Sequence, residues 1–196
     1  MIAVQHISKL FRLGSVLLVV LLTSCVSLMD ATTSKPITSE PGERSLGHYI
    51  DDQRIETVVA VNIRKADPDL RAAHISVISF NGVVLLVGQV ATAANRDAAA
   101  DIAHAVQEVR QVHNELTISG PLSLLARTND SWLTAKIKTK FVFKGGLDSG
   151  RIKIVTENGV VYLMGLVTHA ESDIAVDVAR NSSGIQKIVR VFEYID

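Results

Sequence analysis

The chain has 196 residues, with 20 basic and 20 acidic side chains and one cysteine. A chain with so little net charge is a poor candidate for nucleic-acid binding over its whole surface, and we expect no nucleic-acid partner. A single cysteine cannot form a disulfide within the chain, so the packing of an apolar core has to stabilise the fold.

Residues 1–24 have the order of a secretory signal peptide. Lys9 and Arg12 precede an apolar run from Leu13 to Leu22, and this run has about 10 residues, roughly half of what a bilayer-spanning helix needs. The signal closes with Leu-Thr-Ser before Cys25. That ending resembles the bacterial lipobox, in which the cysteine is acylated and becomes the first residue of the mature protein. An ordinary cleaved signal with a stray cysteine nearby is the alternative.

Cleavage before Cys25 would leave 172 residues and would lower the basic residues to 18, against 20 acidic residues. Each buried methylene of an acyl chain contributes about 0.8 kcal/mol, so several chains would hold the protein on a membrane. Val26 stands where an aspartate would resemble an inner-membrane retention signal. By that resemblance we expect an outer-membrane anchor facing the periplasm. Residues 25–50 are rich in Ser, Thr, Pro and Gly and are predicted to form the acylated cysteine and a flexible tether.

The remainder of the chain is one unit written twice. Asn81-Gly82 and the apolar run to Val90 recur as Asn158-Gly159 and an apolar run to Val167. Such an internal repeat predicts two copies of one small domain, at residues 51–119 and 128–196. Only a short junction separates the copies, so we expect the two domains to pack against each other.

Each copy is predicted to form a helix, two strands, a second helix and a last strand. The first helices are expected near residues 52–65 and 130–144, each opened by an aspartate that caps it or complements its dipole. Asn-Gly is the strongest short hairpin signal, and the apolar run after it predicts a buried central strand. The second helices are expected near residues 93–109 and 170–181. The fold class is therefore α+β, with each domain a three-stranded mixed sheet covered on one face by two helices.

The repeated unit resembles the BON domain, a small module of bacterial periplasmic and membrane-associated proteins. The Asn-Gly hairpins and the glycines Gly88 and Gly165 carry much of the match. With the lipobox in front, the arrangement is similar to the family of dual-BON outer-membrane lipoproteins that bind lipid and are associated with cell division. That resemblance implies that the second BON domain binds anionic phospholipid through its first helix and that the protein supports outer-membrane integrity.

The first helix of the second copy carries a candidate membrane-binding face. At about 100° per residue, Trp132 and Phe143 fall on one side, away from the apolar stripe expected to face the core. An exposed aromatic group flanked by lysines is typical of a helix that lies on an anionic bilayer. With the resemblance, this predicts contact with a phosphatidylglycerol-like surface through six side chains: Trp132, Lys136, Thr139, Lys140, Phe143 and Lys144.

Two other interpretations of this helix stay open at the level of sequence. A lysine-rich helix face is commonly just solvated, and a lone tryptophan could instead pack between the two domains. The position equivalent to Trp132 in the first copy is Arg54, so the fold itself does not require a buried indole there.

The motifs of catalysis are missing from the sequence. The six histidines lack metal-ligand spacing with acidic or cysteine partners, and no phosphate loop or Gly-x-Ser-x-Gly is present. Asp51 and Asp52 are expected to open a helix rather than to act as paired carboxylates. We therefore expect a monomeric, non-enzymatic protein without a metal or cofactor. The alternative to a lipid-binding function is a protein-interaction module or folding helper associated with outer-membrane assembly proteins.

Overall fold

The computed structural model describes residues 45–196, which lie within one compact unit, Pro41–Asp196. The predicted signal peptide, Cys25 and most of the predicted tether lie outside the described residues.

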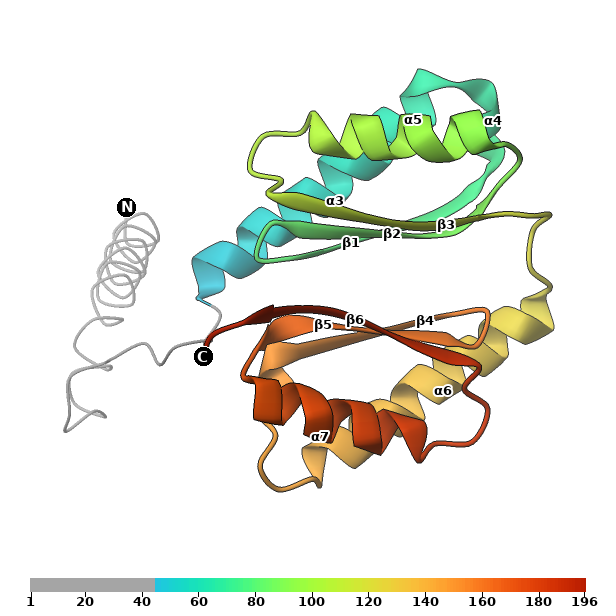
Figure 1. Ribbon diagram of the computed structural model, residues 1–196. Helices are drawn as coiled ribbons and strands as arrows, with labels where there is room; N and C mark the ends of the chain where they lie inside the picture. Colours follow the sequence, from blue (N-terminus) through green and yellow to red (C-terminus); the bar gives the residue numbers. More distant parts are fainter. Residues whose placement is uncertain (1–44) are drawn as a thin grey trace, which may run out of the picture. The chain divides into compact units, whose positions relative to one another are not determined.

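Two domains of the same design follow each other along the described chain (Figure 1). Domain 1 consists of α3 (Leu46–Ala66), α4 (Pro68–Ala72), β1 (His74–Phe80), β2 (Val83–Val90), α5 (Ala93–His104) and β3 (Gln111–Ile118). Domain 2 consists of α6 (Leu124–Val142), the 3-10 turn η1 (Ser149–Arg151), β4 (Ile152–Glu157), β5 (Val160–Val167), α7 (His169–Arg180) and β6 (Lys187–Tyr194). The predicted order of helix, two strands, helix and strand is confirmed in both copies.

Each sheet has its most apolar strand in the centre. The strand orders are β1-β2-β3 and β4-β5-β6, with the first pair antiparallel and the second pair parallel in each sheet. Every residue of β2 is buried, as its continuous apolar run predicts. Asn81 and Gly82 both adopt positive φ, at 51° and 74°, which is what a tight hairpin turn of this kind requires.

In each domain the helices cover one face of the sheet, as the sequence predicts (Figure 1). In domain 1, Ile55, Val59 and Ile63 of α3 pack with Val84 and Leu86 of β2 in one apolar cluster. Domain 2 repeats this arrangement with side chains at the equivalent positions: Leu133, Ile137, Phe141, Val161 and Leu163. Apolar residues at helical spacing therefore point inward in both copies.

A third apolar cluster joins the two domains through the sheet faces that carry no helices. Leu85 and Val87 of β2 share this cluster with Tyr162 and Met164 of β5. Polar contacts also cross between the domains, including Lys153 Nζ donating to Glu56 Oε1 at 2.7 Å. The expectation that the two domains pack against each other is confirmed, because alternate residues of each central strand supply a second apolar face.

Both first helices begin six residues earlier than predicted. Ser45 caps α3 by accepting from His48 N, and Ser123 caps α6 by accepting from Ala126 N. Residues 46–50 are therefore helical rather than the end of a flexible tether. Serine is among the strongest N-cap residues, and these two serines were the available signal for the true helix starts.

The helix α4 was not predicted from sequence. Asp67 caps it by accepting from Asp69 N, and Pro68 occupies its first turn. An aspartate N-cap followed by proline is a helix-start signal. The helix has only five residues, which is too short for apolar periodicity to show.

Candidate membrane-binding face

The buried side of α6 determines which side chains of this helix are exposed to solvent. Leu133, Ile137 and Phe141 are almost completely buried against the sheet of domain 2. Their spacing of four residues places them along one line of the helix. The opposite line, which starts near Leu125 and continues through Trp132, therefore faces away from the core.

Asp130 lies on the buried side of α6 and does not cap the helix. Its carboxylate accepts hydrogen bonds from the amides of Asn158 and Gly159 at 2.7 and 2.8 Å. Asp52 holds the first hairpin in the same way and also accepts from Ser79 Oγ at 2.6 Å. The expectation that these aspartates open the helices is wrong, because both helices start earlier and the carboxylates are needed at the hairpin turns.

Trp132 is exposed to solvent, with 58% of its surface accessible. This excludes the alternative that the indole packs between the two domains. Phe143 is 83% exposed and Val142 is also exposed, although both are large apolar side chains. These residues continue the side of α6 that carries Trp132, so the structure brings the predicted aromatic pair onto one face.

The exposed apolar face extends further toward the start of α6 than the sequence analysis proposed. Leu124 and Leu125 are each 80% exposed. Leu125 precedes Trp132 by seven residues, or about two helical turns, which places both on nearly the same line of the helix. We call the exposed side chains Leu124, Leu125, Trp132, Val142 and Phe143 the outer face of α6. The two leucines were missed because the helix was expected to start only at Asp130.

Lys136 is held beside the indole. Its ammonium lies 4.7 Å from the centroid of the Trp132 ring and donates to Ser183 Oγ at 2.8 Å. A cation over a tryptophan ring contributes about 0.5–1 kcal/mol at an exposed site. The contact therefore orients the indole and keeps one positive charge at the edge of the outer face.

Lys140 has a structural role within domain 2. Its ammonium donates to the carbonyl oxygen of Asn181 and to Ser182 Oγ, both at 2.8 Å. Asn181 is the C-cap of α7, and a lysine at a helix C-terminus satisfies free carbonyl groups and complements the helix dipole. These contacts hold the ammonium at the end of α7, and the predicted contact of Lys140 with lipid stays a prediction.

The remaining predicted positions lie on or just beyond the helix. Thr139 is exposed and donates its hydroxyl to the carbonyl oxygen of Ala135 at 3.0 Å. Phe143 is the C-cap of α6, and Lys144 lies one residue further, exposed. Lys138 is also exposed, on the flank opposite to Lys136 at about 100° per residue. Neither Lys138 nor Lys144 has a side-chain hydrogen bond or ion pair within residues 45–196.

Domain 1 does not reproduce this face on its equivalent helix. At the position of Trp132 it has Arg54, whose guanidinium pairs with the carboxylate of Glu108. At the positions of Val142 and Phe143 it has Arg64 and Lys65. The start of α3 does expose Leu46, at the position of Leu124, and Tyr49. The part of the outer face formed by Trp132, Val142 and Phe143 is therefore what distinguishes α6 from α3.

Within the described residues, no group of three or more His, Cys, Asp or Glu side chains is arranged to hold a metal ion. No helix among these residues is both long enough and apolar enough to cross a bilayer.

The sequence matches the BON domain family twice, over residues 51–120 and 129–196. This chain belongs to the BON domain family. It is 34% identical over 180 residues to the outer membrane lipoprotein DolP of Haemophilus influenzae, covering 90% of this chain and 92% of DolP. It is also 34% identical over 152 residues to the 21 kDa hemolysin of Actinobacillus pleuropneumoniae, covering 78% of each chain. Among solved structures, CdsD of Chlamydia trachomatis, a structural protein of the type III secretion system, aligns with a TM-score of 0.29 and 16% identity over 74% of this chain and 63% of CdsD.

The two family matches fall on the two copies of the internal repeat. In both BON domains the central strand carries a glycine, Gly88 or Gly165, opposite the start of the first strand. A Cβ at Gly88 would lie 2.0 Å from the carbonyl oxygen of His74, and one at Gly165 would lie 2.3 Å from that of Arg151, the residue before β4. Close backbone approach explains why both copies have glycine at this position.

Proposed function

We propose that this BON protein is a non-enzymatic lipoprotein of the outer membrane that faces the periplasm and binds anionic phospholipid through the outer face of α6. The observation that carries the proposal is the exposed line of Leu125, Trp132 and Phe143 with a lysine on each flank, Lys136 and Lys138. Its biological role would be to support outer-membrane integrity, with the protein concentrated where anionic lipid is enriched, such as curved or dividing regions of the envelope.

The apolar part of the outer face has enough exposed area to drive partitioning into a bilayer interface. A large aromatic side chain buries about 150–250 Å² when fully covered, and about 25 cal/mol is gained per Å² of apolar surface removed from water. With 58% of Trp132 and 83% of Phe143 accessible, complete burial of either ring would contribute about 3 kcal/mol. Partial insertion of both rings is therefore sufficient for reversible binding.

The lysines supply the preference for anionic lipid. A lysine near an anionic membrane surface contributes about 1 kcal/mol, and salt screens this contribution. Lys136, Lys138 and Lys144 are the candidates, because Lys140 is committed to the C-terminus of α7. Binding through α6 is therefore expected to weaken as ionic strength rises.

The anchor is proposed to be the acylated Cys25, which lies outside the described residues. The similarity to the outer membrane lipoprotein DolP over 90% of the chain supports this part of the proposal, together with the Leu-Thr-Ser-Cys ending of the signal. Tethering at the N-terminus raises the local concentration of lipid around domain 2, so a weak affinity of α6 would suffice.

The single tryptophan of the chain allows a direct test, since intrinsic tryptophan fluorescence reports on Trp132 alone. The fragment 26–196 contains the whole compact unit and lacks the acyl anchor. It is titrated with phosphatidylcholine vesicles with and without phosphatidylglycerol. We expect a blue shift of the emission and saturable binding only with phosphatidylglycerol, and quenching by brominated lipid chains.

Phe143→Glu keeps the tryptophan reporter and is expected to weaken binding at least tenfold, because each tenfold corresponds to about 1.4 kcal/mol. Val58→Glu is the matched control, since Val58 is a partly exposed apolar residue on the equivalent helix of domain 1. Equal binding to both vesicle types, or equal effects of the two substitutions, would refute the proposal. Salt-resistant co-purification of a protein partner through α6 would instead support an interaction module.

A further inference from the structure

The corner where α3 meets α4 in domain 1 encloses a basic hollow of about 760 Å³. Its charged and polar lining consists of Arg64, Arg71, His74 and Ser76, and no Asp or Glu lines it. The wall of the hollow is β1, which is an edge strand paired only with β2. An edge strand presents unpaired backbone N–H groups in addition to its side chains. The hollow therefore brings several hydrogen-bond donors together without a carboxylate.

The two arginines at this corner have no partner within residues 45–196. Neither Arg64 nor Arg71 forms an ion pair or a side-chain hydrogen bond there, and the same holds for the neighbouring Lys65. The three cations also line an adjoining hollow of about 510 Å³, together with one carboxylate, Asp67. The three cations lie in the last turns of α3 and α4, where their charges complement the helix dipoles. The guanidinium N–H groups of the two arginines still have no hydrogen-bond acceptor within residues 45–196.

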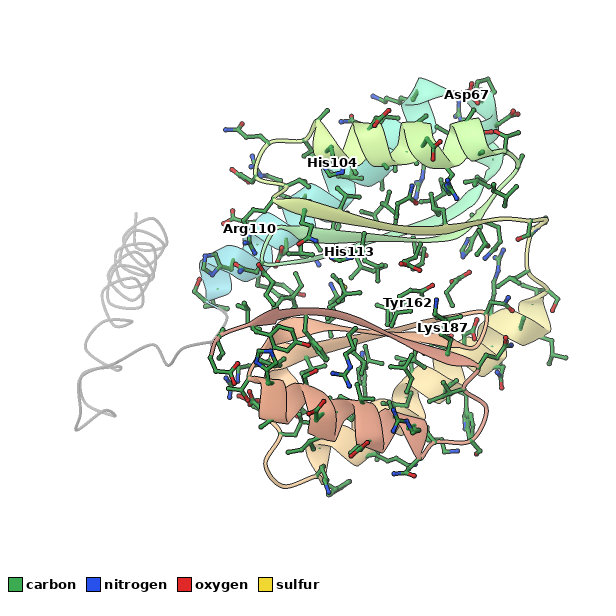
Figure 2. All side chains as sticks on the ribbon, in the orientation of Figure 1. Asp67, His104, Arg110, His113, Tyr162 and Lys187 are labelled. Atoms are coloured by element: carbon green, nitrogen blue, oxygen red, sulfur yellow. The ribbon has the colours of Figure 1, made fainter. Side chains whose placement is uncertain are left out.

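The carboxylate at this corner is already engaged. Asp67 lies at the junction of α3 and α4 (Figure 2), and its Oδ1 accepts from the amides of Asp69 and Leu70 at 2.7 and 3.4 Å. It caps α4 and forms no ion pair with the arginines. Asp67 keeps its negative charge, so it offsets part of the positive charge of Arg64, Lys65 and Arg71 without pairing with either arginine.

Domain 2 provides an internal comparison, because the register of its sheet matches that of domain 1. The residue equivalent to His74 is Arg151, which pairs with Asp148 at 3.1 Å and with Glu171 at 2.9 Å. The residue equivalent to Ser76 is Lys153, which pairs with Glu56 at 2.7 Å. Where domain 2 places cations, the protein itself supplies the anions. At the α3–α4 corner of domain 1, Arg64 and Arg71 form no ion pair within residues 45–196.

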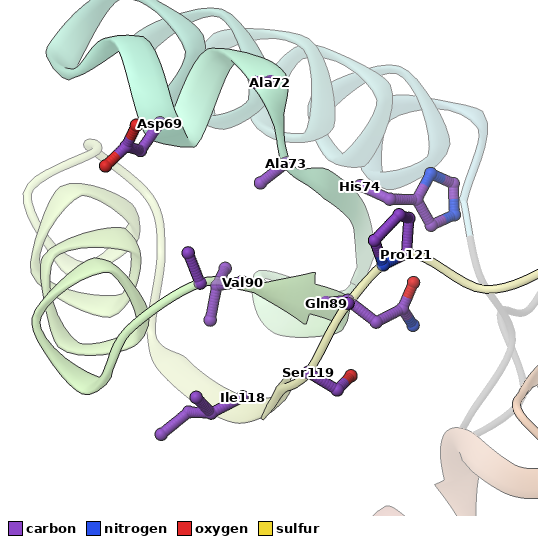
Figure 3. A pocket seen from close by; sticks show the side chains of 11 residues that line it. Asp69, Ala72, Ala73, His74, Gln89, Val90, Ile118, Ser119 and Pro121 are labelled. Carbon is purple, nitrogen blue, oxygen red and sulfur yellow. The ribbon is translucent and has the colours of Figure 1, made fainter.

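An apolar pocket of about 550 Å³ adjoins the basic hollow and shares Ala73 and His74 with it (Figure 3). Its amide side chain, Gln89, already donates to Glu157 Oε1 at 2.6 Å and accepts from Leu122 N at 3.4 Å. No arginine or lysine lines this pocket. The hydrogen-bond donors without a partner therefore line the basic hollow, which contains Arg64 and Arg71, and not the apolar pocket.

We infer that the basic hollow of domain 1 is a binding site for a phosphate group, separate from the outer face of α6. Arginine presents a rigid fork of N–H donors that matches the oxygens of phosphate, and charge-assisted hydrogen bonds of this kind are about twice as strong as neutral ones. The phosphate can belong to a soluble phosphate ester or to a lipid headgroup, since both present the same oxygens to the two arginines.

The site is tested on the 26–196 fragment by NMR, observing backbone amides and arginine Nε–Hε groups. One titration uses inorganic phosphate and a second uses short-chain phosphatidic acid below its micelle concentration, each against sodium chloride at equal ionic strength. We expect saturable shifts at Arg64, Arg71 and the amides of β1. Arg64→Gln and Arg71→Gln should each weaken the affinity about tenfold or more, because hydrogen bonds to charged groups contribute about 1.5–3 kcal/mol.

Arg180→Gln is the matched control, as Arg180 is a 70% exposed arginine of domain 2, and it should leave the affinity unchanged. Saturation by inorganic phosphate supports a soluble ligand, and saturation by the lipid alone supports a headgroup. Shifts that fail to saturate with either probe, or that persist in the double variant, would overturn the inference. The binding of α6 to vesicles should be unchanged in the double variant, so the two proposals can fail independently.

Discussion

Replacing Asp130 with alanine is expected to destabilise domain 2 strongly, because this buried residue lies on the core side of α6 and holds the β4–β5 hairpin. The carboxylate accepts two backbone hydrogen bonds, from the buried amide of Gly159 and the partly buried amide of Asn158. An unsatisfied buried donor costs about 1–3 kcal/mol. With one amide fully and one partly shielded from water, we expect a loss of about 2–4 kcal/mol in the free energy of unfolding. That is a large fraction of the 5–15 kcal/mol typical of a domain.

The measurement is urea unfolding of the 26–196 fragment, followed by circular dichroism and by the fluorescence of Trp132. Asn129→Ala is the control, since Asn129 is the exposed neighbour of Asp130 on the same helix, and it should change the free energy by less than about 0.5 kcal/mol. Hydrogen exchange gives a second readout, because the Gly159 amide should lose its protection in Asp130→Ala.

The equivalent substitution in domain 1, Asp52→Ala, gives a second test of the same reasoning. Asp52 accepts from Ser79 Oγ at 2.6 Å as well as from the hairpin amides, and Ser79 is completely buried. Asp52→Ala should therefore be at least as costly as Asp130→Ala. The reasoning fails if Asp130→Ala costs no more than Asn129→Ala, or if the Gly159 amide stays protected in that variant.

Three further predictions concern the packing of a glycine, the titration of a buried tyrosine and the separate roles of two lysines. Gly165→Ala would place a Cβ 2.3 Å from the carbonyl oxygen of Arg151 and should lower the unfolding midpoint sharply. Gly145→Ala, with nothing within 4 Å of the new Cβ, should not. Burial raises the pKa of Tyr162 to about 12, so an absorbance titration should show that it ionises at higher pH than an exposed phenol. Because the folded-state pKa lies above the unfolded value, the contribution of Tyr162 to stability is complete below about pH 10 and is lost as pH rises toward 12. Lys140→Met should cost about 1–2 kcal/mol of stability through its two lost hydrogen bonds and should leave vesicle selectivity intact. Lys138→Met should weaken vesicle binding and leave stability unchanged. The reverse pattern would contradict a structural role for Lys140 and a membrane-binding role for Lys138.

Much of the architecture follows from local signals in the chain. The two Asn-Gly hairpins, the apolar runs after them and the helical spacing of Ile55, Val59 and Ile63 predicted the elements of both domains. These signals are local, because a type I′ turn needs residues that tolerate positive φ and a helix needs its apolar side chains on one line. The helix starts were misplaced because an aspartate was interpreted as a cap, while the serine caps, Ser45 and Ser123, stood seven residues upstream of the buried aspartates.

The membrane-binding face was only partly predictable. The helical wheel placed Trp132 and Phe143 together, and their exposure in the structure agrees with that placement. The wheel also placed Lys140 beside them, but it could not show that the end of α7 lies within reach of the ammonium. A lysine side chain is long enough to choose among several partners, and that choice depends on which loop packs nearby.

The sequence by itself determined the repeat, the order of elements and the inward and outward faces of each helix, because these depend on residues close together in the chain. Tertiary structure alone decided that the two sheets share an apolar cluster, that the aspartates hold the hairpins, and that Arg64 and Arg71 line one hollow without an ion pair. Each of those facts joins groups that are distant in sequence or separated by a turn, and only the folded backbone sets the distances between them.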